Sequence, residues 1–135
     1  MAYWLLKTEP TCYSWEQFTK DRKTVWDGIT NNAALLHLRS MKKGDSAFFY
    51  HTGDQRSIVG IAEVTREAYP DPKLRDDKLK VVDIKLVAPL PTPVSLDTIK
   101  SDPAFAGWDL LRISRLSVVP TPPAMWKRVL QLAKG

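Results

Sequence analysis

Short apolar runs and one segment of alternating apolar and charged residues predict several β-strands in the chain. Apolar runs of strand length cover residues 3–6, 46–51 and 58–65. Between residues 82 and 86, apolar residues alternate with charged ones, which is typical of a strand with one face in water. A last strand is predicted over residues 115–119. The chain is therefore rich in short strands.

Helical spacing separates these strands. Ser14 and Gln17 have the spacing of a capping box, which predicts a short helix that ends near residues 21–23. A second helix is predicted to start at Asn31 or Asn32, because apolar residues then recur at intervals of three and four.

The C-terminal third contains further helical signals. A short helix is predicted over residues 95–100, and Asp102 precedes a proline that can open another helical turn. Pro122 or Pro123 opens a C-terminal helix with one apolar side.

Prolines and glycines mark the predicted interruptions. Residues 68–73 break the sheet, the charged segment 73–80 forms an exposed loop, and three prolines between residues 89 and 93 form a spacer. Gly60 removes a side chain in mid-strand, which indicates a bulge, tight curvature or the close approach of a ligand.

The order of these elements bounds the fold class. Strands separated by short helices at irregular spacing do not form a doubly wound sheet, which needs repeated strand-helix units. An α+β fold with a curved mixed sheet or small barrel is predicted. With 135 residues and 44% hydrophobic residues, the chain 1–135 is expected to form a single domain.

The N-terminal segment and the single cysteine limit the expected cellular compartment and the possible covalent or metal cross-links. The first apolar run is interrupted by Lys7 and Glu9, too early for a signal peptide or membrane span, so a cytoplasmic protein is expected, or a nuclear one in a eukaryote. A lone cysteine, Cys12, can form neither an internal disulfide nor a thiolate zinc cage.

The net charge of +5 is compatible with polyanion binding and equally with an ordinary surface. The positive excess is concentrated from residue 91 onward.

Motifs for common catalytic chemistry are missing from the sequence. It contains no phosphate loop, dinucleotide fingerprint, nucleophile elbow or HExxH zinc motif. His51 could serve as a base only beside a partner acid, for which Glu9, Asp27 or Asp45 are the candidates. The case for an enzyme is therefore weak.

Aromatic, amide and hydroxyl residues collect at predicted strand ends and turns. Aromatic faces stack on bases, while amides, hydroxyls and guanidinium groups bind base edges. The alternative is that the aromatic residues simply fill the core. The residues concerned are Trp26, Asn31, Tyr50, His51, Thr52, Tyr69, Arg115 and Ser117.

Seven blocks, in order along nearly the whole chain, resemble the EVE domain family. They are YWLLKTEP at 3–10, WDGITN at 26–31, MKKGD at 41–45, FFYH at 48–51, IVGI at 58–61, EAYPD at 67–71 and SRLSV at 114–118. The resemblance implies a PUA-like fold, a curved mixed sheet or pseudo-barrel with flanking short helices, related to the YTH readers of methylated adenosine in RNA.

The resemblance also implies a function. We expect a non-catalytic nucleic-acid-binding domain that recognises a modified base, with modified cytosine in DNA favoured and no cofactor or membrane contact. A reader of modified RNA and a small nucleotide- or base-modifying enzyme using His51 are the alternatives. By position, the implied pocket residues are Trp26, Asn31, Tyr50, His51, Thr52, Tyr69, Arg115, Leu116 and Ser117.

The sequence departs from the family pattern at three positions. Thr30 stands where the family usually has arginine, which removes a charge that could contact phosphate. Thr52 replaces a serine and keeps the hydroxyl. Leu79 stands where a tryptophan is common, so an aromatic element is missing.

Overall fold

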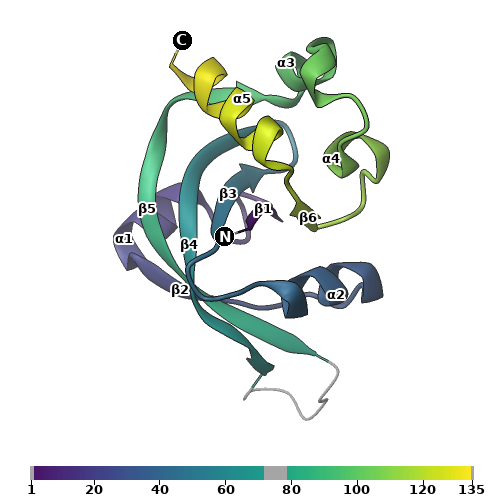
Figure 1. Ribbon diagram of the computed structural model, residues 1–135. Coiled ribbons are helices and arrows are strands. Elements are labelled where there is room, and N and C mark those ends of the chain that lie inside the picture. The colour runs from purple at the N-terminus through teal and green to yellow at the C-terminus, as the bar shows by residue number, and fades with distance from the viewer. Residues whose placement is uncertain (1, 72–78, 135) are drawn as a thin grey trace.

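Six strands form one curved mixed sheet in the order β2-β5-β4-β3-β1-β6 (Figure 1). The computed structural model describes residues 2–71 and 79–134. β2 and β6 are the two edges of the sheet and do not pair with each other, so the sheet curves without closing into a barrel. The strands are β1 (Tyr3–Thr8), β2 (Lys23–Trp26), β3 (Ser46–His51), β4 (Ser57–Pro70), β5 (Lys80–Ser95) and β6 (Val118–Pro120).

β1 and β3 are the central feature of the sheet because they pair in parallel, whereas every other paired strand is antiparallel. In their register Lys7 lies opposite Tyr50 and Thr8 opposite His51. The carboxyl ends of both strands therefore meet at one end of the sheet.

Short helices flank this sheet, and side-chain caps define where three of the α-helices begin. Ser14, Asn31 and Ser95 each accept a hydrogen bond from the backbone N–H three residues later. The capping predictions at Ser14 and Asn31 are thereby confirmed. The helices are α1 (Trp15–Asp21), α2 (Asn32–Ser40), α3 (Leu96–Ser101), the 3-10 turn η1 (Pro103–Phe105), α4 (Asp109–Arg112) and α5 (Pro123–Ala133).

The two longest strands correct two predictions. β4 continues to Pro70 instead of stopping at residue 68, because Tyr69 pairs with Val81 across two register shifts. β5 runs through the three prolines that were predicted to form a spacer. It tolerates them because β2 pairs with β5 only as far as Lys85, so beyond Leu86, whose N–H donates to Arg22 O, that edge of β5 needs no N–H donors for β2. Of the loop predicted at 73–80, residues 73–78 lie outside the described residues, and Lys80 already belongs to β5.

Further corrections concern short elements. β2 was missed, because four residues are too few to show alternation and its pairing partner lies in distant β5. α4 is a single turn and was also missed. The last strand begins at Val118 and not at 115, since Leu116 N–H donates to Ile113 O in a turn before it.

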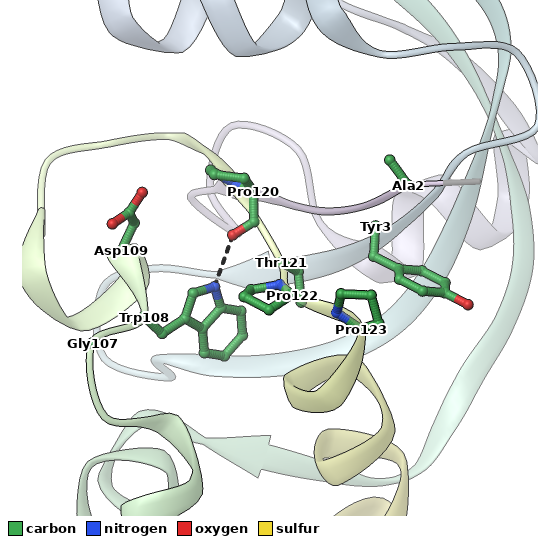
Figure 2. Close-up of a pocket in the computed structure, with 9 residues that line it drawn as sticks. All are labelled: Ala2, Tyr3, Gly107, Trp108, Asp109, Pro120, Thr121, Pro122 and Pro123. Carbon is green, nitrogen blue, oxygen red and sulfur yellow. Dashed lines mark hydrogen bonds between the residues drawn. The ribbon is translucent and has the colours of Figure 1, made fainter.

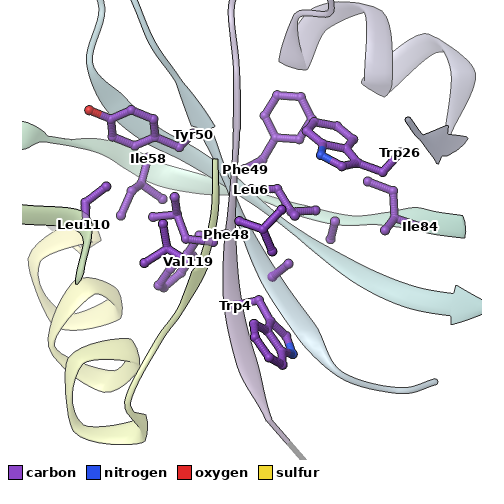
Figure 3. Packing of buried hydrophobic residues seen from close by; sticks show 14 of the residues in the cluster. Trp4, Leu6, Trp26, Phe48, Phe49, Tyr50, Ile58, Ile84, Leu110 and Val119 are labelled. Carbon is purple, nitrogen blue, oxygen red and sulfur yellow. The ribbon is translucent and has the colours of Figure 1, made fainter. Parts of the chain in front are cut away.

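Buried aromatic rings dominate the core (Figure 3). Phe49 lies at its centre and packs against Trp26 at 5.5 Å and Phe18 at 5.3 Å between ring centroids. Gly60 lies at a register shift between β4 and β5, and a side chain there would overlap the Trp15 ring. Of the three alternatives predicted for Gly60, the structure shows the bulge, and the group that approaches closely is the protein's own Trp15 and not a ligand.

At the amino ends of β1 and β3, Asp45 joins the two strands. Its carboxylate, 3% exposed, accepts hydrogen bonds from Ala2 N at 3.1 Å, Trp4 Nε1 at 3.0 Å and Lys42 N at 2.9 Å. Burial opposes ionisation, but these donors hold the pKa of Asp45 below its usual range.

Among the residues that the structure describes, no helix combines the length and apolar character needed to cross a bilayer.

Candidate functional site

A hollow of about 680 Å³ lies where the curved sheet comes near to closing. One side is the carboxyl end of β1 and the following loop, and the other is β2 with the turn after it. We call it the Trp26 pocket. Its lining residues are Lys7, Thr8, Glu9, Cys12, Tyr13, Thr24, Val25, Trp26, Asp27, Gly28, Ile29 and Ser117.

Aromatic and apolar groups form the inner wall of the Trp26 pocket. Trp26 is 6% exposed, and its ring meets Phe49 and Tyr13 edge to face. Ile29, also buried, follows the turn at Gly28, whose φ of 77° suits glycine. The wall is rigid because the same rings belong to the core.

Polar groups surround the mouth of the pocket. Glu9 and Asp27 are exposed carboxylates on opposite sides of the hollow, and Ser117 adds a hydroxyl. Lys7 donates from Nζ to Ser114 O at 2.9 Å, and burial lowers the pKa of its ammonium group. Burial likewise raises the pKa of Tyr13, whose hydroxyl donates to Asp21 Oδ2 at 2.9 Å. The pocket thus combines hydrogen-bond acceptors, donors and an apolar wall.

A second hollow, of about 250 Å³, adjoins the first and shares Lys7 with it. We call it the Arg56 pocket. Tyr50 and Thr52 of the predicted site line this pocket and not the Trp26 pocket. The reason is strand geometry: Tyr50 follows Phe49 in β3, so their side chains point to opposite faces of the sheet (Figure 3). Its lining residues are Lys7, Tyr50, Thr52, Gly53, Arg56, Leu96, Lys100, Leu110 and Ser114.

His51 is buried and both of its ring nitrogens have partners. Nε2 accepts a hydrogen bond from Trp15 N at 2.9 Å, which leaves the proton on Nδ1, 2.6 Å from Gln55 Oε1. His51 therefore anchors the start of α1 to the end of β3. It also lines a mostly apolar hollow of about 550 Å³ together with Trp15 and Pro89.

The remaining predicted residues lie elsewhere. Asn31 uses Oδ1 to accept from Ala34 N at 3.0 Å and so fixes the start of α2. Tyr69 lies near the far end of β4, where its hydroxyl donates to Asp83, and burial together with Asp83 raises its pKa to about 12. Arg115 is exposed, and Leu116 is buried. Of the nine predicted residues, the structure brings only Trp26 and Ser117 to the Trp26 pocket.

At the departures from the family pattern, Thr30 is exposed in the turn after Ile29, and Leu79 packs against the core. Leu79 thus keeps an apolar contact where the family has an aromatic one.

Sequence reasoning missed several pocket residues. Lys7 and Thr8 were treated only as the end of a strand, and Glu9 and Asp27 were named only as possible partner acids for His51 and not as pocket residues. Their meeting depends on curvature that brings β1 toward β2, although these strands lie near opposite edges of the sheet. The signal that could have found Asp27 was its place beside Trp26 in the WDG turn.

Another hollow, of about 450 Å³, lies between Tyr3 and the prolines before α5 (Figure 2). The indole N–H of Trp108 donates to Pro120 O at 3.0 Å, which engages the polar group of that ring. Asp109 is the one charged residue of its lining. This hollow is a poorer match to a polar ligand than the Trp26 pocket.

Fold and pocket together define a small α+β binding domain with a pocket suited to a flat ligand that carries hydrogen-bonding edges. The chain belongs to the EVE domain family, which it matches over residues 2–132.

Solved structures with the same fold include bacterial and human proteins. Rpa0253 from Rhodopseudomonas palustris is 44% identical, with a TM-score of 0.94 over 99% of this chain and 94% of that one. Human THYN1 in complex with DNA containing 5-methylcytosine is 28% identical, with a TM-score of 0.91 over 100% of this chain and 99% of that chain.

The expected relation to YTH domains is confirmed at the level of the fold. The YTH domain of Zygosaccharomyces rouxii MRB1, in complex with N6-methyladenosine RNA, has a TM-score of 0.62 at 14% identity over 98% of this chain and 86% of that chain.

Curated relatives include thymocyte nuclear protein 1 of Rattus norvegicus, 35% identical over 125 residues. The alignment covers 73% of this chain and 55% of that protein, so the chain spans about half the length of the relative.

Proposed function

We propose that this chain is a non-catalytic nucleic-acid-binding domain that accommodates a modified base, modified cytosine in DNA foremost, in the Trp26 pocket. The observation that carries the proposal is the chemistry of that pocket, an apolar aromatic wall with carboxylates at its mouth. Family membership and the likeness to human THYN1 bound to 5-methylcytosine DNA support it.

The pocket lining matches the groups of a methylated cytosine. Asp27 or Glu9 can accept a hydrogen bond from the exocyclic amino group, as carboxylates do with cytosine N4. Ile29 and Trp26 offer apolar contact to a methyl group, and Ser117 can bond a ring nitrogen or carbonyl. A base without an exocyclic amine would leave these carboxylates unpaired.

Energetics explain why the polar groups matter. Extruding a base from a duplex costs a few kcal/mol, while stacking on an aromatic side chain returns about 1–3 kcal/mol. Trp26 is mostly covered by its neighbours and acts as a wall more than as an open platform. Hydrogen bonds to the base edge must therefore supply the discrimination.

The placement of His51 supports binding and not catalysis. A general base needs a lone pair that is free to take a proton from the substrate. The Nε2 lone pair of His51 already accepts from Trp15 N, and the candidate partner acids lie elsewhere. Glu9 and Asp27 line the Trp26 pocket, and Asp45 is bonded at the opposite end of β3.

The test measures binding of DNA and RNA oligonucleotides with unmodified, methylated and hydroxymethylated cytosine, and of N6-methyladenosine RNA, to wild type and variants. We expect a preference for modified cytosine. Asp27→Asn should weaken binding of the preferred oligonucleotide by about tenfold. Glu16→Gln, the same charge change on the exposed face of α1, away from both pockets, should bind like wild type.

Because Trp26 is buried, a variant at this position must not leave a large cavity in the core. Trp26→Ala would open a cavity next to Phe49, so Trp26→Phe is the better probe of the wall. No preference among the modifications, with Asp27→Asn and Trp26→Phe both binding like wild type, would refute the proposal. Turnover of a modified nucleoside that disappears in His51→Gln would instead favour the enzyme alternative.

A further inference from the structure

The Arg56 pocket gathers cations from three separate elements. Lys7 comes from β1, Arg56 from the loop between β3 and β4, and Lys100 from α3. Hydroxyl groups of Thr52 and Ser114 lie in the same lining. A small hollow with three positive charges and neutral hydroxyls suits a compact anion with several acceptor oxygens, which describes a phosphate group.

These cations lack the carboxylate partners that other basic residues of the protein have. Arg112 pairs with Asp109 at 3.1 Å and Arg128 with Asp102 at 2.8 Å. Within residues 2–71 and 79–134, neither Lys7, Arg56 nor Lys100 forms an ion pair.

Asp97, in the first turn of α3, is an acid close to these cations: burial raises the pKa of Tyr50, the charge of Arg56 lowers it, and that of Asp97 raises it. With three cations against this one acid, the net charge around the Arg56 pocket remains positive.

The backbone places Arg56 at this pocket in an unusual conformation. Its φ of 39° lies in the left-handed region, which side chains other than glycine and asparagine rarely adopt. The conformation is held because Arg56 O accepts a hydrogen bond from Leu96 N at 2.7 Å. Local strain of this kind is concentrated at binding sites.

One thin partition separates the Arg56 pocket from the Trp26 pocket. Lys7 lines both, its N–H donates to Ser117 O at 3.0 Å, and its Nζ donates to Ser114 O. The partition is therefore the Lys7 side chain with residues 114–117. In a nucleic-acid strand the phosphates follow directly on either side of each nucleotide, so a base in the Trp26 pocket places a phosphate close to this partition.

We propose that the Arg56 pocket binds the backbone phosphate adjacent to the base held in the Trp26 pocket. This inference rests on the proposed function and deepens it by fixing the path of the strand across Lys7. The Ser114 hydroxyl donates to a phosphate oxygen, while Arg56 and Lys100 supply the charge. Tyr50 and Thr52, which line this pocket, therefore lie beside the nucleic-acid backbone and not beside the base.

The first experiment removes charge on one side of the partition only. The double variant Arg56→Gln/Lys100→Gln is compared with a control double variant, Lys42→Gln/Lys43→Gln. The control removes the same charge at the opposite end of β3. We expect the Arg56 and Lys100 variant to bind modified and unmodified oligonucleotides roughly tenfold more weakly, with a salt slope reduced by about one to two. The preference for the modified base should stay unchanged.

The second experiment removes the charge from the ligand. One methylphosphonate linkage, which is neutral, is placed directly 5′ or directly 3′ of the modified base. Wild type should lose affinity with one of these oligonucleotides, and the Arg56 and Lys100 variant should lose none, because the contact is already absent. Thermal unfolding of each variant checks that the fold is intact.

The outcomes separate this inference from the proposed function. The phosphate site would be overturned if the affinity losses caused by the variant and by the neutral linkage were additive. It would also be overturned if the Lys42 and Lys43 control reduced the salt slope equally. In both cases the base preference would stand. Loss of base preference in wild type would instead overturn the proposed function. Non-additive losses with an intact preference support the site.

Discussion

The two ends of the parallel β1–β3 pair differ in whether their polar groups are bonded within the protein or lie open to a ligand. At the Asp45 end, one carboxylate receives three hydrogen bonds and is buried. At the Lys7 end, Glu9, Asp27 and Ser117 surround one hollow, and Arg56 and Lys100 line the next. The first end holds the strands together, and the second leaves bonding capacity for a ligand. Substitutions should therefore affect stability at one end and binding at the other.

The largest effect is expected from Asp45→Ala. The change leaves the buried indole N–H of Trp4 and the partly buried backbone N–H groups of Ala2 and Lys42 without their acceptor, which should lower the free energy of unfolding by about 3 kcal/mol. Thermal and urea unfolding measure this. Asp54→Ala, in an exposed loop, should change stability by less than about 0.5 kcal/mol. If both variants lowered the free energy of unfolding equally, the Asp45 end would have no special structural role.

Acid should weaken the Asp45 end in the same way. The pKa of Asp45 is lower in the folded state than its ordinary value of 3.8, so its ionised form contributes stability that is fully present above that value. The contribution is lost as pH falls through the folded-state pKa. The stability difference between wild type and Asp45→Asn should then be constant near neutral pH and shrink in strong acid. Urea unfolding across a pH series checks this, and a constant difference would contradict it.

At the Lys7 end, Lys7→Met should separate binding from stability. The ammonium group is partly desolvated, and its bond to Ser114 O lies at the surface, so the free energy of unfolding should change by no more than about 0.5 kcal/mol. Binding to DNA should weaken about tenfold, because both pockets lose a cation. Lys43→Met is the matched control. A large loss of stability would show that Lys7 is structural.

The smallest effect is expected from Thr121→Val. Thr121 Oγ1 is buried and, within the described part of the chain, has no hydrogen-bond partner. It stands near the Asp45 end, since Thr121 N donates to Tyr3 O. Replacing the hydroxyl with a methyl group should raise the free energy of unfolding by about 0.5–1 kcal/mol. Thr121→Ser, which keeps the hydroxyl and removes the methyl group, should lower it, and equal values for both would contradict the explanation.

Local chemistry predicted much of the fold. Ser14 was predicted as a helix cap, and Asn31 as one of two candidates with Asn32, because capping depends on residues three positions apart. β2 and the proline-containing half of β5 were not predicted, since pairing with a distant strand decides them. Propensity alone marks Pro89 and Pro91 as breaks, and only the sheet shows that one edge there is unpaired.

The site was harder to predict than the fold. The family pattern led to Trp26 and Ser117, both of which line the pocket. It also grouped Tyr50 with Trp26, although alternation along β3 sends Tyr50 to the other face. Asp27 and Lys7 come together only through the curvature of the sheet, which no local pattern contains.

The prolines of β5 have a further consequence, for self-association. Beyond Lys85, β2 no longer covers β5, and a bare strand edge can recruit a strand from another molecule and seed aggregation. Pro89, Pro91 and Pro93 carry no N–H, so a strand docking on this edge would find few donors. The same residues that interrupt the sequence pattern therefore guard the longest strand of the sheet against polymerisation.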